Sequence, residues 1–304
     1  MNGRRGWSPG LGSVLCALLV SGCGGGLPEE SASPGEAREA LINGSSATAA
    51  EFPATGAVLL MRGYGPTYVY EPQCTGTLIT PTVVLTAAHC LAGYSASRMH
   101  FTLDANANAT TPGTRVSSFW TLMHPDYTGG LTYDLGLMYL HASPGGAVAV
   151  LPTPVENGTV AADTPTWLVG YGYTQVNQGG LFGHKHKGTA QVTFANPMWL
   201  DMSPPSQGAS NCSGDSGGPA FIPRGGQSNV VIGVVHGGLN SDSRCRSGAN
   251  FARTGTSLMW IHRNVLLPCD SGLPCDQRCG DQRCDPAYEN TSSCPHDCQP
   301  EWAR

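Results

Sequence analysis

The sequence predicts an all-β domain that ends in one helix and is followed by a small disulfide-rich tail. Three observations lead to this prediction. The 304-residue chain holds 41 Gly and 23 Pro but only 12% charged residues, which favours short strands and turns over long surface helices. Apolar and β-branched runs recur at short spacing between residues 41 and 267. Six cysteines then fall within residues 269–298, where large apolar residues are scarce.

Length and charge restrict the classes of function. A chain of this length can bury a sizeable core, as one large domain or as two ordinary ones. The net charge of −5, without a basic cluster, argues against a nucleic-acid partner. Twelve cysteines indicate an oxidising compartment.

The N-terminus is typical of an export signal. Arg4 and Arg5 precede an apolar run over residues 11–20, which is too short to span a bilayer but suits the core of a signal peptide. The run ends in "VSGC", which resembles the lipobox of bacterial lipoprotein signals. We therefore expect a signal peptide over residues 1–22 and lipid attachment at Cys23; an ordinary signal peptide with a chance cysteine is the alternative.

The following segment, residues 24–40, is rich in Gly, Pro, Ser and Glu and cannot bury enough apolar surface to fold. It is interpreted as a linker or pro-segment. With Cys16 removed in the signal and Cys23 acylated, ten cysteines remain, and this even number suits a disulfide framework.

Strand candidates follow in order along the domain. They are "AVLLM" at 57–61, "TGTLIT" at 75–80, "TVVLTAA" at 82–88, "TWLVGYGY" at 166–173 and "NVVIGVV" at 229–235. Only "TSLMWIHRNVLL", residues 256–267, has helical spacing, because Leu258, Ile261, Val265 and Leu266 can share one face. We expect it to form a closing helix.

Three short stretches carry the residue types of nucleophilic catalysis. A serine hydroxyl needs a base to take its proton, and the base must be oriented by a third group. "NCSGDSGGPA" places Ser216 among small residues, although a plain glycine-rich turn would have similar residues. "LTAAHC" places His89 after an apolar run, and "YDLGLMYL" places Asp134 where a partly buried carboxylate can bond to His89. The other candidate acids, Asp104, Asp126 and Asp163, open no apolar strand.

These stretches, in the order His, Asp, Ser, resemble the chymotrypsin-like (trypsin-family) serine proteases. The resemblance extends to "LINGSSA", "GYG", "GVVHGG" and the last helix. It implies two packed six-stranded antiparallel β-barrels with the catalytic residues between them, and a monomeric serine endopeptidase that acts on proteins or peptides. The expected organisation is a signal peptide (1–22), a lipid-anchor linker or pro-segment (23–40), a protease domain (41–267) and a Cys-rich module (268–304).

The resemblance assigns a role to each residue. Ser216 is expected to be the nucleophile, His89 the general base and then acid, and Asp134 the group that holds the imidazole tautomer. The backbone N–H groups of Gly214 and Ser216 are expected to form the oxyanion hole, which explains the small residues around the serine. It further implies two disulfides, Cys74–Cys90 and Cys212–Cys245.

The resemblance also implies activation by cleavage. A cut before Leu41 would free an ammonium group that pairs with Asp215, because a buried carboxylate without a partner is costly. Residue 40 is Ala and the nearest basic residue is Arg38, so we expect a cut between Ala40 and Leu41 by an activator that prefers small residues, or by the enzyme itself. This cut would separate the domain from a lipid on Cys23.

Two departures from the family concern specificity. The usual Ser-Trp-Gly before the pocket is replaced by His236, Gly237 and Gly238. The resemblance implies that His236 takes the place of the serine that hydrogen-bonds the catalytic aspartate. Ser210 stands at the pocket base where trypsin-like enzymes have aspartate. With open walls at Gly238 and Gly248, we expect cleavage after large apolar or aromatic residues. His236 leaves glutamate specificity as an alternative, and a protease fold impaired in catalysis and used for binding is a second alternative.

Metal and cofactor sites are not expected in the catalytic domain, where "HKH" at 184–186 is interpreted as a polar loop. The tail resembles short Cys-rich repeats of bacterial secreted proteins, some of which look like calcium-binding modules. Calcium ligation and a solvated acidic surface both remain open for it. Its oxygen-bearing residues are Asp281, Asp285, Glu289, Asn290 and Asp297.

Overall fold

A computed structural model describes residues 41–63, 68–109, 114–204, 208–239 and 244–265. The signal peptide, the lipidation at Cys23, the linker and the Cys-rich module fall outside the described residues. No helix in the described part of the chain is long and apolar enough to cross a membrane.

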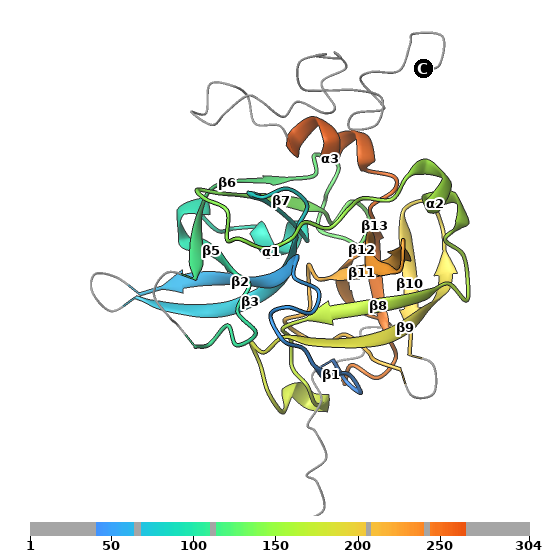
Figure 1. The fold of residues 1–304 in the computed structure, drawn as a ribbon, viewed down its shortest axis with the longest axis horizontal. Coiled ribbons are helices and arrows are strands. Elements are labelled where there is room, and N and C mark those ends of the chain that lie inside the picture. The colour runs from blue at the N-terminus through green and yellow to red at the C-terminus, as the bar shows by residue number, and fades with distance from the viewer. Residues whose placement is uncertain (1–40, 64–67, 110–113, 205–207, 240–243, 266–304) are drawn as a thin grey trace, which may run out of the picture. The chain divides into compact units, whose positions relative to one another are not determined.

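The first half of the domain is a closed antiparallel barrel with strand order β2-β3-β4-β7-β6-β5 (Figure 1). Buried side chains from most of its strands fill the interior, among them Val58, Leu85, Phe101 and Leu137. The strands are β2 (Thr55–Arg62), β3 (Val69–Leu78), β4 (Val83–Thr86), β5 (Met99–Thr102), β6 (Arg115–Met123) and β7 (Gly136–Leu140).

The second half is also a closed six-stranded antiparallel barrel, with strand order β8-β9-β10-β13-β12-β11 and a final pairing between β8 and β11. The short strand β1 (Ser45–Ser46) adds to β9 outside this ring. Leu168, Val192, Leu200 and Phe251 are buried in its core. The strands are β8 (Pro165–Gly170), β9 (His186–Ala195), β10 (Trp199–Ser203), β11 (Pro219–Arg224), β12 (Gln227–Gly238) and β13 (Ala249–Arg253).

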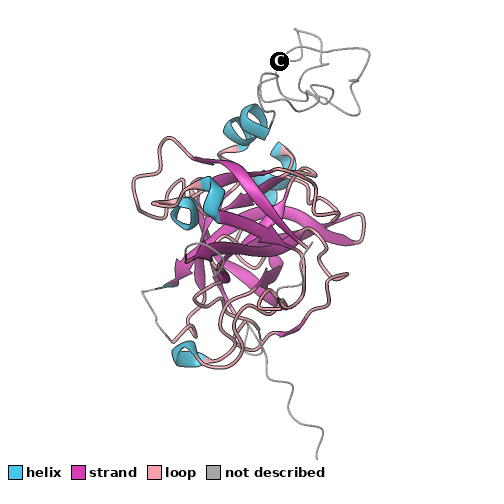
Figure 2. Ribbon diagram, turned by 90° about the vertical axis from the view of Figure 1, so that its left-hand side faces the viewer, coloured by secondary structure: helices cyan, strands magenta, loops and turns pink. Residues whose placement is uncertain are grey.

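The predicted all-β fold with two six-stranded barrels is therefore confirmed. Each of the five quoted strand candidates overlaps a strand, and the expected closing helix is α3 (Leu258–Val265), whose Ile261 is fully buried. Figure 2 shows that the helices lie around a strand-rich centre. The expectation of one helix was incomplete, because short helices hold too few turns to show a period. They are α1 (Ala88–Leu91), α2 (Pro154–Thr159), η2 (Ala96–Arg98) and η3 (Val176–Gln178).

The two barrels pack through one continuous apolar cluster. Val58 and Leu85 of the first barrel belong to the same buried cluster as Val169 and Phe221 of the second. Polar contacts join the halves as well. Thr75 on β3 donates its N–H to the carbonyl of Ser216 and its hydroxyl to the carbonyl of Gly214, at 2.8 and 3.0 Å. This junction sets the Ser216 loop against the first barrel.

Candidate active site

His89 lies on α1, directly after the apolar strand β4. Ala87 and Ala88 are fully buried and bring the backbone close to the barrel, as the small residues of "LTAAHC" predict. The backbone N–H of His89 donates to Oδ1 of Asp134 at 2.9 Å, and its Nδ1 lies 2.6 Å from Oδ2 of the same carboxylate. These two bonds hold the ring in one orientation.

Asp134 precedes β7 and is fully buried. Burial alone would raise the pKa of its carboxyl group. Hydrogen bonds from the side chains of His236 and His89, and from the His89 backbone, outweigh burial and hold the pKa below its usual value. The carboxylate is therefore ionised at neutral pH.

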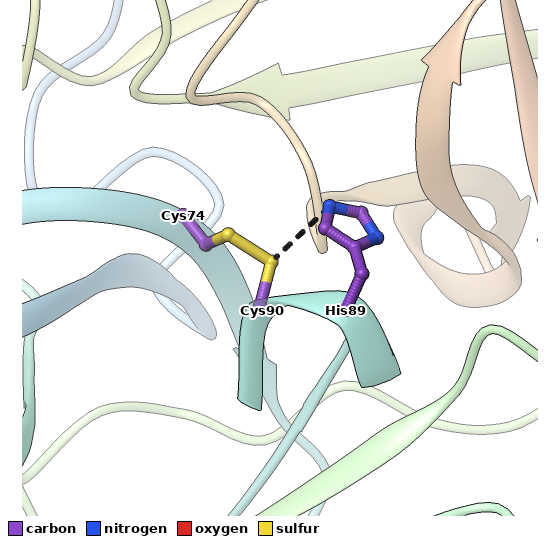
Figure 3. A group of neighbouring side chains, drawn as sticks. All are labelled: Cys74, His89 and Cys90. Carbon is purple, nitrogen blue, oxygen red and sulfur yellow. Dashed lines mark hydrogen bonds between the residues drawn. A yellow bond between two sulfur atoms is a disulfide. The ribbon is translucent and has the colours of Figure 1, made fainter. Parts of the chain in front are cut away.

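A disulfide between Cys74 and Cys90 ties α1 to β3 beside the histidine (Figure 3). The Cys90 sulfur lies 3.7 Å from Nε2 of His89. The three side chains are close enough to be considered for a metal ion, but the sulfurs are bonded to each other and offer no thiolate. The contact restrains the ring of His89.

Ser216 lies in a tight turn in which Asp215 donates its N–H to the carbonyl of Cys212. Gly214 has a φ of 96°, a conformation that L side chains rarely adopt, and a Cβ there would collide with the ring of Phe182. Among the described residues, the N–H groups of Gly214 and Ser216 donate to no protein acceptor. Both N–H groups are therefore free for an oxygen of a substrate.

The Ser216 hydroxyl makes one long contact, 3.5 Å to the carbonyl of His236. In the part of the chain that the structure describes, no hydrogen bond joins it to His89. Such bonds are often long or poorly aligned without substrate, and they form in the complex.

Asp215 is fully buried below the same turn, and the backbone N–H groups of Cys212 and Gly172 donate to its two oxygens, each at 2.8 Å. Burial raises its pKa to about 7 although both bonds lower it. A Cβ at Gly170 or Gly172 would collide with this carboxylate, which accounts for the glycines of "GYG". The disulfide between Cys212 and Cys245 holds the turn to the neighbouring loop.

Ser210, the expected pocket base, is buried and accepts a 3.1 Å hydrogen bond from the N–H of Gly248. Its backbone pairs with Ile42 in both directions, so the segment after Leu41 docks beside it. Leu41 itself is fully buried in the second barrel. Gly238 lies in the β12–β13 ladder opposite Ala249.

His236, expected in the place of the serine that bonds the catalytic aspartate and also as a substrate-binding residue, turns its ring toward Asp134. Its Nδ1 lies 2.6 Å from Oδ2 of Asp134, and its ring meets the ring of His89 edge to face at 5.6 Å between centroids. His89, Asp134 and His236 are close enough to be considered for a metal ion, but their facing atoms already bond to one another.

Two features near the site were not predicted. Thr75 ties the Ser216 loop to the first barrel. Its place directly after Cys74 is the one feature of the sequence that could have drawn attention to it. The "HKH" stretch is not a polar loop, because Lys185 and His186 are buried at the start of β9. His186 bonds to the hydroxyl of Ser46.

The trypsin family model matches residues 41–261. The chain is 26% identical over 230 residues to the trypsin of Saccharopolyspora erythraea, covering 71% of this chain and 93% of that relative. It is also 26% identical over 251 residues to Trypsin CFT-1 of Choristoneura fumiferana (76% and 93%) and over 215 residues to Glucanase inhibitor protein 3 of Phytophthora infestans (66% and 81%). Because the family match covers most of the chain and both barrels, the chain belongs to the trypsin family and is a serine endopeptidase with protein substrates.

Proposed function

We propose that Ser216, His89 and Asp134 hydrolyse peptide bonds through an acyl-enzyme. The observation that carries this proposal is the pair of hydrogen bonds from His89 to the buried carboxylate of Asp134. With its proton on Nδ1, His89 has an unprotonated Nε2 that can take the proton of the Ser216 hydroxyl as the serine attacks the carbonyl carbon. His89 then gives this proton to the leaving amine, and water repeats the two steps on the acyl-enzyme.

The oxygen that becomes negative in each tetrahedral intermediate needs fixed donors. The N–H groups of Gly214 and Ser216 supply them, because neither bonds within the described protein. Gly214 has a positive φ and no side chain that could block an oxygen at these donors.

For specificity, we propose cleavage after large apolar or aromatic residues. The buried Ser210 offers no charge for Arg or Lys, and its hydroxyl is already used by the N–H of Gly248. The ring of His236 bonds to Asp134, which favours this specificity over glutamate.

We further propose that the protein is exported and lipid-anchored at Cys23 until a cut between Ala40 and Leu41 releases the active domain. Two disulfides in the domain fit an oxidising, extracellular compartment. Asp215 is fully buried, and burial raises its pKa, so an ionised Asp215 needs a positive partner. The new ammonium group would supply that partner.

A non-catalytic binding role is the second candidate, since one similar protein is named a glucanase inhibitor. The intact Ser, His and Asp of this chain favour the enzyme. A fluorophosphonate, which reacts with activated serines, tests this directly. We expect labelling of the processed wild type and of Ser213→Ala, whose exposed serine is a matched control, and none of Ser216→Ala. An unlabelled wild type with a Leu41 N-terminus would leave the binding role.

A further inference from the structure

We propose that the Cys-rich module, residues 268–304, packs on one face of the first barrel, which we call the Trp120 face. This face is made of Phe119 and Trp120 on β6, Tyr139 on β7 and the last residues of α3, Asn264 and Val265. The proposal concerns the attachment of the module to the protease domain, and it does not depend on the proposed catalytic roles.

Trp120 gives this face its exposed apolar surface. Its side chain is 55% exposed, more than any other aromatic side chain in the described part of the chain. Trp120 lies directly opposite Tyr139 in the antiparallel ladder of β6 and β7, so both side chains project from the same face of the sheet. The ring of Phe119 lies 6.3 Å from the ring of Tyr139. An exposed indole beside two further aromatic rings is typical of a surface that another protein segment covers.

The end of α3 already covers the neighbouring part of this face. The hydroxyl of Tyr139 donates to the carbonyl of Asn264 at 2.5 Å, and the ring of Trp260 lies 4.7 Å from that of His124, directly after β6. α3 therefore lies next to β6 and β7 (Figure 1). Tyr139 is only 2% exposed, whereas Trp120, about 5 Å away across the ladder, is left uncovered. The covered part of the face thus ends close to the last residues of α3.

The chain leaves α3 beside the uncovered indole. Only Leu266 and Leu267 separate Val265 from the module, and an extended chain spans at most about 3.6 Å per residue. The first cysteine of the module, Cys269, therefore lies within about 15 Å of Val265. A module held by so short a linker has an effective concentration on the order of millimolar at this face, so a weak contact is enough to dock it.

The composition of the module fits the surroundings of Trp120. Residues 268–304 hold seven Asp and Glu but only three Arg, and the last turn of α3 carries His262 and Arg263. An acidic partner is therefore favoured at this end of the helix. Six cysteines hold together a module that is too poor in apolar residues for a core of its own. Its two aromatic residues, Tyr288 and Trp302, are thus available to contact the domain.

A photo-cross-linker in place of the indole identifies what covers it. The full chain with Ser216→Ala, which prevents self-cleavage, receives Trp120→p-benzoylphenylalanine, a large aromatic residue that bonds to neighbouring C–H groups under ultraviolet light. We expect peptide mapping to find residues 268–304 attached to position 120. The control is Phe194→p-benzoylphenylalanine on β9 of the second barrel, where the aromatic side chain is 48% exposed. The control should give at least about 10-fold fewer such products, because the module is held at the other barrel.

Three results would overturn the proposal. The first is no attachment of module peptides at position 120, or equal attachment at both positions. The second is cross-linking between light and heavy peptides in a mixture of unlabelled and ¹⁵N-labelled chains, which would assign the face to a second copy of the chain. The third is attachment only to lipid when phosphatidylglycerol vesicles are present, which would assign the face to a membrane.

Limited proteolysis tests the same contact without a cross-linker. Thermolysin cleaves before Leu, and a docked module shields Leu266 and Leu267. The four cysteines of the described domain pair with each other, so none of them retains the module after the cut. In the Ser216→Ala chain we expect Trp120→Ser to release the module about 10-fold faster, because release follows the population of the undocked form. Phe194→Ser is the matched control and should leave the rate unchanged. Equal rates in Trp120→Ser and its parent chain would contradict docking at this face.

Discussion

The buried carboxylate of Asp215 accepts a 2.8 Å hydrogen bond from the backbone N–H of Gly172, in the loop that follows β8. The N–H of Cys212 bonds to its other oxygen. None of the ion pairs among the described residues includes Asp215, and burial raises its pKa to about 7. The turn that carries Ser216 therefore rests on a carboxyl group that gains little from being charged.

This pKa predicts an unusual pH dependence of stability in the uncut chain. The folded state binds a proton on Asp215 between about pH 4 and pH 7, whereas the unfolded state has lost it. The contribution is complete below pH 4 and lost as the pH rises through 7, at most about 4 kcal/mol. Urea unfolding of Ser216→Ala, with and without Asp215→Asn, measures it. We expect the difference between the two curves to change over this range and to be flat above it.

Cleavage between Ala40 and Leu41 should lower the pKa of Asp215 and so remove this loss of stability with rising pH. Leu41 is already fully buried in the uncut chain, so the cut changes the charge of its nitrogen more than its packing. An ammonium group next to Asp215 favours the ionised carboxylate and a formed oxyanion hole. We expect mass spectrometry of active enzyme to find Leu41 at its N-terminus, and activity to rise about 100-fold or more on cleavage. Full activity in a chain that retains acylated Cys23 would refute this scheme.

Lys185 predicts a second pH effect, of the opposite sign. Its side chain is almost fully buried, its Nζ donates to the carbonyl of Phe52, and burial lowers its pKa to about 8 despite the nearby Glu51. Between about pH 8 and 10.5 the unfolded state binds more protons, so the free energy of unfolding should rise with pH there, by at most about 3 kcal/mol.

The variant Lys185→Met tests this effect, because it keeps the length of the side chain and removes the charge. We expect it to be at least as stable as wild type at pH 7, with the advantage shrinking toward pH 10.5 in urea unfolding. The partly buried Lys187, paired with Glu51, gives a control in Lys187→Met, which should show no such trend. A Lys185→Met chain that is much less stable at pH 7 would mean that the bond to Phe52 outweighs the cost of burying the charge.

Sequence patterns predicted the strands and the small-residue turns, because these structures depend mainly on residues that are neighbours in the chain. The strand runs around Val84, Leu168 and Val231 alternate with turn residues, and the small residues beside His89 and Ser216 have one structural use each. They therefore led to the barrels and to the candidate catalytic residues.

Contacts between distant segments were not predictable in the same way. The ring of His236 faces Asp134, 102 residues earlier, because two barrels meet there. Only the family resemblance pointed to this contact, because no local pattern around His236 predicts it. Lys185 likewise looks like a loop residue until β9 and the carbonyl of Phe52 enclose it. The six-residue helix α2 was missed for another reason. Its capping box of Thr153 and Glu156 is visible in the sequence, but a helix this short has no detectable apolar stripe.

Ser210 provides the last prediction, a change of substrate preference. In wild type its hydroxyl accepts from the N–H of Gly248 in a buried position, so the pocket base carries no charge. The substitution Ser210→Asp adds a carboxylate that can keep this hydrogen bond and pair with a basic substrate side chain. A peptide library should show cleavage after large apolar residues by wild type and a shift of about 100-fold or more toward Arg and Lys in the variant. Ser97→Asp, which adds the same charge on exposed η2, should leave the preference unchanged. If wild type already prefers Arg or Lys, Ser210 is not the base of the pocket.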